Sequence, residues 1–120
     1  MEPKRILFLL RHAPYASSHA LEALESVLVA GVFDQRVSVL FCGDGVWQLV
    51  NGQDGAAVDR RSIGKVAQAL PQYEITQLYA CADALSDRGL TADDLALPVA
   101  VIDHAGQRAL IAAQDVVVND

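Results

Sequence analysis

Short blocks of apolar residues, separated by polar or glycine-containing turns, recur along the whole chain. Five of these blocks have the length of a β-strand and lack polar alternation, which is typical of parallel strands covered on both faces. They are Lys4 to Leu10, Arg36 to Cys42, Thr76 to Ala80, Pro98 to Asp103 and Asp115 to Val118. The pattern therefore predicts a sheet of five short, buried strands.

Helices are predicted between these strands. Apolar residues from Leu21 to Leu28 recur at helical spacing, and this helix should end near Gly31. Further helices are predicted at Val46 to Val50, from Ile63 to Leu70 with Pro71 as the end, at Cys81 to Arg88 and at His104 to Gln114. Crossovers between parallel strands cover both faces of a sheet, so we expect residues 1 to 120 to form a single α/β domain, a three-layer sandwich with a mostly parallel sheet.

The glycine turn after the second predicted strand is the most distinctive local feature. Cys42 precedes Gly43-Asp44-Gly45, and the next apolar run contains Trp47, the only tryptophan. Glycine adopts backbone angles that other residues resist, and an aspartate accepts hydrogen bonds from the free amides of a following turn. Because no dinucleotide-binding or Walker loop is present, we interpret the turn as a helix cap and Trp47 as an anchor in a core or an interface.

Composition narrows the classes of function. The 120 residues are 52% hydrophobic and 20% charged, which is typical of a folded globular domain. The net charge of −6 disfavours direct binding to RNA or DNA, because non-specific nucleic-acid affinity comes from clustered lysine and arginine. No apolar run approaches the roughly 20 residues that span a bilayer, and no export signal is present. We therefore expect a cytoplasmic protein without membrane contact.

Cys81 is the strongest candidate nucleophile. It falls where the third predicted strand turns into a helix, and a helix N-terminus favours a thiolate or a persulfide. The alternative is that Cys81 is simply a small buried residue. The only other cysteine, Cys42, forms no C-x-x-C pair with it, so neither a disulfide framework nor a metal site is predicted, and no cofactor is expected.

Two histidines suggest a different chemistry. Arg11-His12-Ala13 after the first strand and His104-Ala105-Gly106 after the fourth resemble the opening and the late motif of the histidine phosphatases. In that family one histidine takes the phosphoryl group while arginines and a second histidine bind its oxygens; Arg60 or Arg61 would have to supply a second arginine here. The chain is much shorter than that family usually is.

A second resemblance covers nearly the whole chain. It is carried by Phe41-Cys42-Gly43-Asp44-Gly45-Val46-Trp47-Gln48-Leu49, Gly52-Gln53, Tyr79-Ala80-Cys81-Ala82-Asp83-Ala84-Leu85, Arg88-Gly89-Leu90 and Asp115-Val116-Val117. These segments resemble the TusC/DsrF branch of the DsrE-like sulfur-relay proteins. The D-G-V-x-Q-L turn followed by G-Q is its specific part, whereas C-A-x-x-L-x-x-R-G is shared by related subunits. Cys42 departs from the family pattern and is given no role.

The resemblance implies a flavodoxin-like fold and a cytoplasmic hetero-hexamer with TusB-like and TusD-like subunits. Such a complex passes persulfide sulfur from a TusA-like to a TusE-like carrier and serves 2-thiolation of the wobble uridine of tRNA. The principal sulfur-carrying cysteine belongs to the TusD-like subunit, which implies a structural or accessory role for this chain, with Cys81 as a possible carrier. We expect the subunit interface at Asp44, Val46, Trp47, Gln48 and Leu49.

Overall fold

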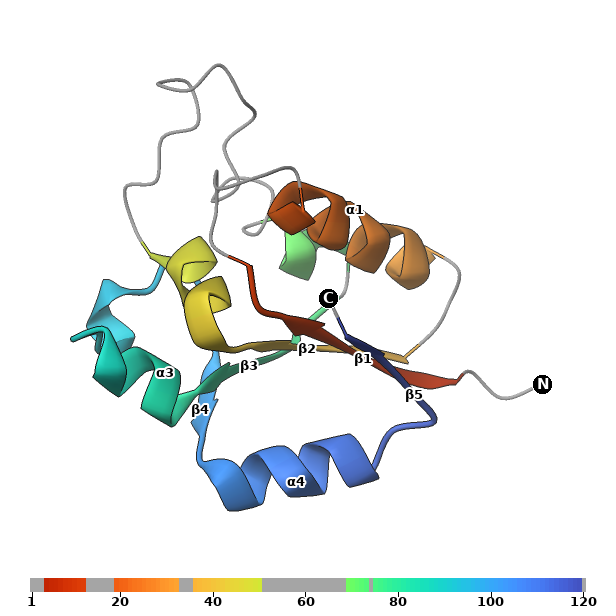
Figure 1. Cartoon of the computed structure of the whole chain (residues 1–120). Coiled ribbons are helices and arrows are strands. Elements are labelled where there is room, and N and C mark those ends of the chain that lie inside the picture. Colours follow the sequence, from red (N-terminus) through yellow and green to blue (C-terminus); the bar gives the residue numbers. More distant parts are fainter. Residues whose placement is uncertain (1–3, 13–18, 33–35, 51–68, 74, 120) are drawn as a thin grey trace.

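A parallel sheet forms the centre of the molecule. The computed structural model describes residues 4–12, 19–32, 36–50, 69–73 and 75–119 of the chain. The strands pair in parallel in the order β4-β3-β2-β1-β5 (Figure 1). They are β1 (Arg5–Leu10), β2 (Arg36–Phe41), β3 (Gln77–Cys81), β4 (Ala100–Ile102) and β5 (Val116–Asn119). The predicted five parallel strands are confirmed, with small differences at their ends.

The strand order explains how the helices divide between the two faces. β1 to β4 step across the sheet in one direction, whereas β5 returns beside β1. Because crossovers between parallel strands are right-handed, the return step places its helix on the opposite face. Accordingly α1 (His19–Val32) covers one face and α4 (His104–Ala112) the other (Figure 1). The three layers are as predicted, but the order differs from the 2-1-3-4-5 order of flavodoxin.

Each inner strand contributes side chains to two apolar cores. On the α1 face, Phe8 and Phe41 pack with Leu24 of α1. On the α4 face, Leu7, Leu9 and Leu40 form a smaller core against Tyr79, Ile102 and Leu110. Successive residues of a strand point to opposite faces, so a strand that is buried on both faces shows no polar alternation.

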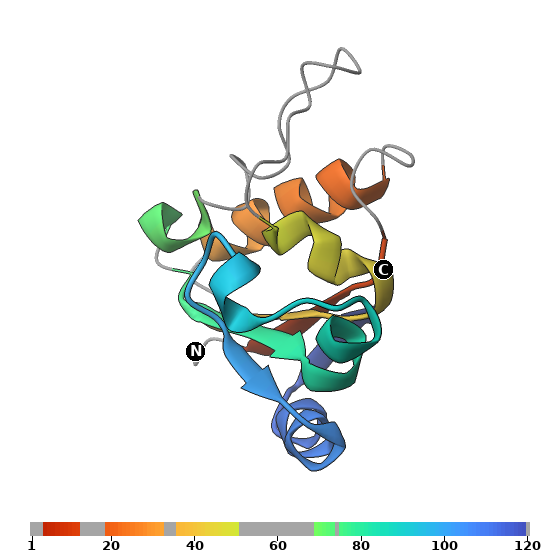
Figure 2. The ribbon, with the colours of Figure 1, turned by 90° about the vertical axis from the view of Figure 1, so that its left-hand side faces the viewer.

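The segment after β2 differs from its prediction. The structure forms a 3₁₀-helix, η1 (Gly43–Leu49), where an α-helix from Val46 was expected. Its turns are closed by i to i+3 hydrogen bonds, such as the Gly45 N–H to the Cys42 carbonyl at 2.9 Å. Figure 2 shows η1 on the same side of the sheet as α1, with α4 on the other side. With seven residues, η1 is longer than most 3₁₀-helices.

The remaining helices are short. They are η3 (Leu70–Tyr73), α3 (Ala82–Asp87) and η4 (Ala92–Asp94). Pro71 is the second residue of η3, a place that tolerates proline because it lies in the first turn. The predicted loops at residues 13–17 and 51–59, the arginines at 60 and 61, and most of the helix expected from Ile63 lie outside the described residues.

Several large apolar side chains remain exposed at the edges of the sheet. On the edge strand β5, Val116, Val117 and Val118 are 37–39% exposed. Ile111 of α4 is 41% exposed and Val101 of the opposite edge strand β4 is 44% exposed. Exposed apolar residues on an edge strand are typical of surfaces that meet another chain.

The length and polarity of the described helices also bear on membrane insertion. Within the described ranges, no helix is both long and apolar enough to cross a bilayer.

Candidate functional site

Cys81 lies at the carboxyl edge of the sheet, which we define as the last residues of β1 to β4 and the positions directly after them. It is the last residue of β3 and the N-cap of α3, and its side chain makes no capping hydrogen bond. Only 8% of Cys81 is exposed. From α4, the Gln107 side-chain amide donates to the Cys81 Sγ at 3.2 Å and approaches the Ile102 carbonyl at 3.4 Å. The thiol is therefore at the predicted strand-to-helix junction, beneath a side chain of the opposite layer.

A polar side-chain contact joins α3 and α4 beside Cys81. His104 Nε2 lies 2.8 Å from Asp83 Oδ2, and both side chains are exposed. Asp103 caps α4, since its Oδ1 accepts the Gly106 N–H at 2.8 Å. The N-termini of α3 and α4 are thus held together at the carboxyl edge.

The two histidines follow strands that are not neighbours. His12 follows β1 and His104 follows β4, and the strand order places β2 and β3 between them. Three strand spacings of about 4.8 Å therefore lie between the two positions, and the His104 side chain contacts Asp83. The strand order gives the phosphatase hypothesis no support, and that hypothesis stays a prediction.

Asp44 links two elements through an ion pair that was not predicted from the sequence. Its Oδ1 accepts hydrogen bonds from Arg88 Nη2 at 2.8 Å and Arg88 Nε at 3.2 Å. Arg88 Nη1 also donates to the Ala84 carbonyl at 3.0 Å, which fixes the guanidinium on α3. Asp44 was expected to cap its own helix; instead it ties η1 to α3. The available signal in the sequence was an acidic residue, Asp44, in the glycine turn and a basic residue, Arg88, in the C-A-x-x-L-x-x-R-G segment.

The two glycines beside Asp44 are favoured for different structural reasons. Gly43 has a φ of +51°, which favours glycine. A Cβ atom on Gly45 would lie 1.9 Å from the Leu10 carbonyl oxygen, so only glycine lets η1 approach the end of β1. The G-D-G turn therefore packs a 3₁₀-helix directly on the carboxyl edge.

The predicted interface segment is mostly internal. Val46 and Leu49 are fully buried in the α1-face core, and Gln48 is 1% exposed. Gln48 Nε2 donates to the His12 carbonyl at 2.9 Å, while its Oε1 has no hydrogen-bond partner among the described residues. Within this segment, Asp44 is exposed and Trp47 is half-buried, so a partner would reach these two side chains first.

Cys42, which the sequence left without a role, borders a hollow of about 250 Å³ at the carboxyl edge. The lining residues are Leu9, Arg11, Leu40, Cys42, Gly43, Gln107 and Ile111. Burial raises the pKa of the Cys42 thiol, whereas the charge of Arg11 and its hydrogen bond to Cys42 act in the opposite direction. The same Gln107 that contacts Cys81 therefore also lines the hollow at Cys42.

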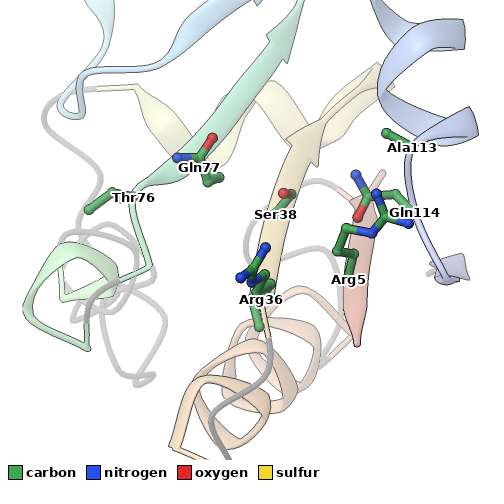
Figure 3. A pocket seen from close by; sticks show the side chains of 8 residues that line it. Arg5, Arg36, Ser38, Thr76, Gln77, Ala113 and Gln114 are labelled. Carbon is green, nitrogen blue, oxygen red and sulfur yellow. The ribbon is translucent and has the colours of Figure 1, made fainter. Parts of the chain in front are cut away.

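A larger hollow of about 460 Å³ lies at the opposite, amino end of the strands (Figure 3). Ser38 lies at its centre, between Gln77 of β3 and Gln114 after α4. Arg5 lines it too, but Arg5 Nη2 already forms an ion pair with Asp115 at 3.4 Å. This hollow is separate from Cys81, which lies at the other end of β3.

Metal binding has no support in the described part of the chain. No group of three or more histidine, cysteine, aspartate or glutamate side chains gathers there in a way that would hold an ion.

Comparison with known proteins gives a consistent result. Residues 4–119 match the DsrE/DsrF-like family. The intracellular sulfur oxidation protein DsrF of Allochromatium vinosum is 45% identical over 92 residues, which are 77% of this chain and 68% of that protein. The TusC homolog of Pseudomonas aeruginosa is 37% identical over 114 residues, or 95% of this chain and 96% of that protein.

A solved structure supports the same fold. The ychN protein of E. coli superimposes with a TM-score of 0.86 at 16% identity, covering 98% of this chain and 99% of that one. At this identity the likeness concerns the fold alone.

Proposed function

The chain belongs to the DsrE/DsrF-like family, and from that premise we propose that it is a TusC/DsrF-like subunit of a cytoplasmic sulfur-relay assembly. The observation that carries the proposal is its likeness to proteins named DsrF and TusC over most of its length. The partners would be TusB-like and TusD-like subunits in a hetero-hexamer, with TusA-like and TusE-like carriers delivering and removing persulfide sulfur. The assembly would supply the sulfur for 2-thiouridine at the tRNA wobble position.

The burial of Cys81 favours an accessory role. A sulfur atom that passes between proteins requires the two thiols to come into contact, but Cys81 is only 8% exposed and lies beneath Gln107. The chain would therefore contribute mainly its surface to the assembly, while an exposed cysteine on another subunit carries most of the sulfur. The alternative, with Cys81 as a carrier, requires α4 or a partner to open access to it.

A second role is favoured by one comparison. The Allochromatium vinosum protein, at 45% identity, is named for sulfur oxidation and not for tRNA modification. The same relay chemistry would then deliver sulfur to an oxidation pathway. In both roles the acidic chain, with a net charge of −6, acts through other proteins and does not bind nucleic acid itself.

The apolar surface supports membership of an assembly. Trp47 of η1 is half-buried, and a separate group of exposed valines lies on the edge strand β5. Aromatic side chains near the centre of an interface often dominate its binding energy. We propose Trp47 and Asp44 as contacts with a partner, and Val46, Gln48 and Leu49 as the internal support for their position.

Co-expression with TusB-like and TusD-like subunits tests the assembly. We expect Trp47→Ala to lower the recovered complex by about tenfold, which corresponds to about 1.4 kcal/mol, with a smaller loss for Asp44→Ala. Size-exclusion chromatography after affinity capture measures the complex, and Glu22→Ala, an exposed acidic position on α1, is the matched control for Asp44→Ala. Full assembly with both variants would remove the interface assignment.

Complementation tests the role of Cys81. In cells that lack their own TusC-like subunit, we expect the chain to restore 2-thiouridine, and Cys81→Ser to retain most of that activity if the role is accessory. Mass spectrometry of tRNA nucleosides gives the readout. Loss of 2-thiouridine with normal assembly of Cys81→Ser would instead make Cys81 a carrier.

A further inference from the structure

Cys42 and Cys81 are neighbours across two strands. The register of β2 and β3 aligns Leu40 with Tyr79 and Phe41 with Ala80, so the next position pairs Cys42 with Cys81. The Cys42 N–H donates to the Leu10 carbonyl at 3.0 Å, which keeps it in line with the sheet. Neighbouring strands lie about 4.8 Å apart, within the Cα separation of about 4.4–6.8 Å that a disulfide spans.

Strand alternation and a hydrogen bond place both sulfur atoms on the side of the sheet that α4 covers, while Cys81 also packs in the core on the α1 side. Residues two apart in a strand share a face, so Cys42 faces as Leu40 does and Cys81 as Tyr79 does. Leu40 and Tyr79 both belong to the apolar core on the α4 side. The hydrogen bond from Gln107 of α4 to the Cys81 Sγ independently places that sulfur on this face.

The hollow beside Cys42 gives the pair access to solvent. Cys42 is half-buried and lines the hollow, whereas Cys81 is 8% exposed and is not among the residues that line it. Gln107 lines the hollow and contacts the Cys81 Sγ, so it connects the two positions. Burial raises the pKa of the Cys42 thiol overall, and the positive charge of Arg11 beside the sulfur opposes that shift.

We propose that Cys42 and Cys81 form a sulfur-exchange pair, in which a sulfane sulfur atom passes between their Sγ atoms at this hollow. The proposal rests on the proposed function, because the relay supplies the persulfide. It assigns a role to Cys42 and connects the buried Cys81 to solvent through the Cys42 sulfur.

The exchange is balanced without an external oxidant or reductant. The Cys42 thiolate attacks the terminal sulfur of a Cys81 persulfide, and a bond forms between Cys42 Sγ and that sulfur. The bond from Cys81 Sγ to the terminal sulfur breaks, and its electron pair leaves with Cys81 Sγ as a thiolate, which takes up the proton that Cys42 released. The products are a Cys42 persulfide and a Cys81 thiol, and loading of Cys81 is the reverse reaction.

A thiol oxidant tests whether the two sulfurs meet. Treatment of the purified full chain with diamide is expected to give an intramolecular Cys42–Cys81 disulfide, detected by non-reducing peptide mapping. The control, Cys42→Ser with Ser26→Cys, keeps the number of thiols but moves one to an exposed position on α1, across the sheet. It should form no intramolecular disulfide. Absence of the disulfide in the unmodified chain overturns the proposal.

Cyanide tests the exchange itself. The chain is loaded with glutathione persulfide, the donor is removed, and cyanide then takes sulfane sulfur as thiocyanate. We expect Cys81 to gain sulfane sulfur from the donor, and to lose it to cyanide, about tenfold or more slowly in Cys42→Ser, because the intramolecular route is gone in both directions. The Ser26→Cys control should not restore either rate. Equal or faster rates in Cys42→Ser, or failure of Cys81 to load in the unmodified chain, overturn the proposal.

These outcomes are independent of assembly. Both experiments use the purified chain and a small-molecule donor, so exchange without hexamer formation would count against the proposed function alone. Normal assembly without exchange would count against the thiol pair alone.

Discussion

At the scale of single residues, the carboxyl edge depends on a few side chains with more than one partner. Gln107 contacts both Cys81 and the Ile102 carbonyl, and Arg88 contacts both Asp44 and the Ala84 carbonyl. Gly45 has no side chain, and this lets η1 lie against the carbonyl of Leu10. The candidate site is thus built on contacts between elements and not on one motif.

Gly45→Ala should destabilise the fold. The new Cβ would lie 1.9 Å from the Leu10 carbonyl oxygen, so η1 or β1 must shift. We expect a loss of about 1–3 kcal/mol in the free energy of unfolding, as for other overpacked sites. Urea denaturation measures it. Gly89→Ala is the control: it meets nothing within 4 Å, and its φ of +68° carries a cost of about 1 kcal/mol. A larger loss for Gly89→Ala would contradict the packing argument.

At the scale of elements, two polar links fix segments that are distant in the sequence. Asp44 and Arg88 join η1 to α3 at the carboxyl edge. At the other end, the Arg5 N–H donates to Asp115 Oδ2 at 2.9 Å, and the Asp115 N–H donates to the Arg5 carbonyl at 2.8 Å. The second link sets the start of β5 beside β1, so it fixes the register of the last strand.

The Asp115 link predicts a dependence of stability on pH. The Arg5 backbone N–H, and then its guanidinium, lower the pKa of the Asp115 carboxyl in the folded chain. A lowered folded pKa stabilises the fold above the unfolded value, about 3.9, and this contribution is lost as the pH falls through the folded pKa. As the pH falls below about 4, the free energy of unfolding of Asp115→Asn should therefore decrease less than that of the unmodified chain.

Urea denaturation at neutral and acidic pH measures this difference. Asp93→Asn, an exposed aspartate of η4, is the control and should leave the acid-induced loss nearly unchanged. An identical acid response of Asp115→Asn and the unmodified chain would show that the link contributes nothing to pH dependence.

At the scale of the whole molecule, β5 returns to lie beside β1, and the crossover that leads to it carries α4. Among the described residues, α4 is the helix that covers this face of the sheet. The edge strands and α4 consequently expose apolar side chains, including Val117 and Ile111. Such an arrangement fits a protein whose surface is completed by other subunits.

The exposed edge predicts that the isolated chain associates with itself. We expect sedimentation velocity to show a concentration-dependent shift from monomer to larger species, because an unpaired apolar edge strand promotes association. Val118→Lys on β5 should reduce the association, since a charged lysine on an edge disfavours pairing. Val29→Lys, on the exposed surface of α1, is the matched control. Equal association of Val118→Lys and the unmodified chain would exclude β5 as the contact.

Local patterns in the sequence determined the elements and the family. Apolar runs without polar alternation predicted the strands, and the D-G-V-W-Q-L turn carried the family resemblance. The predicted burial is confirmed for β1 and β2 but wrong for the edge strands β4 and β5, which are mostly exposed. Cys81 was found because a strand-to-helix junction is readable from neighbouring residues. The 3₁₀ form of η1 could not be predicted from local sequence, since it depends on close packing of Gly45 against Leu10.

Tertiary structure alone decided which distant residues meet. Strand order, which a list of strands does not contain, separated His12 from His104 and placed Cys42 beside Cys81. The packing of η1 on the sheet buries Val46, Gln48 and Leu49, although their motif is the most family-specific part of the chain. The physical reason is that element formation depends on residues close in sequence, whereas register, face and burial depend on how separate elements pack.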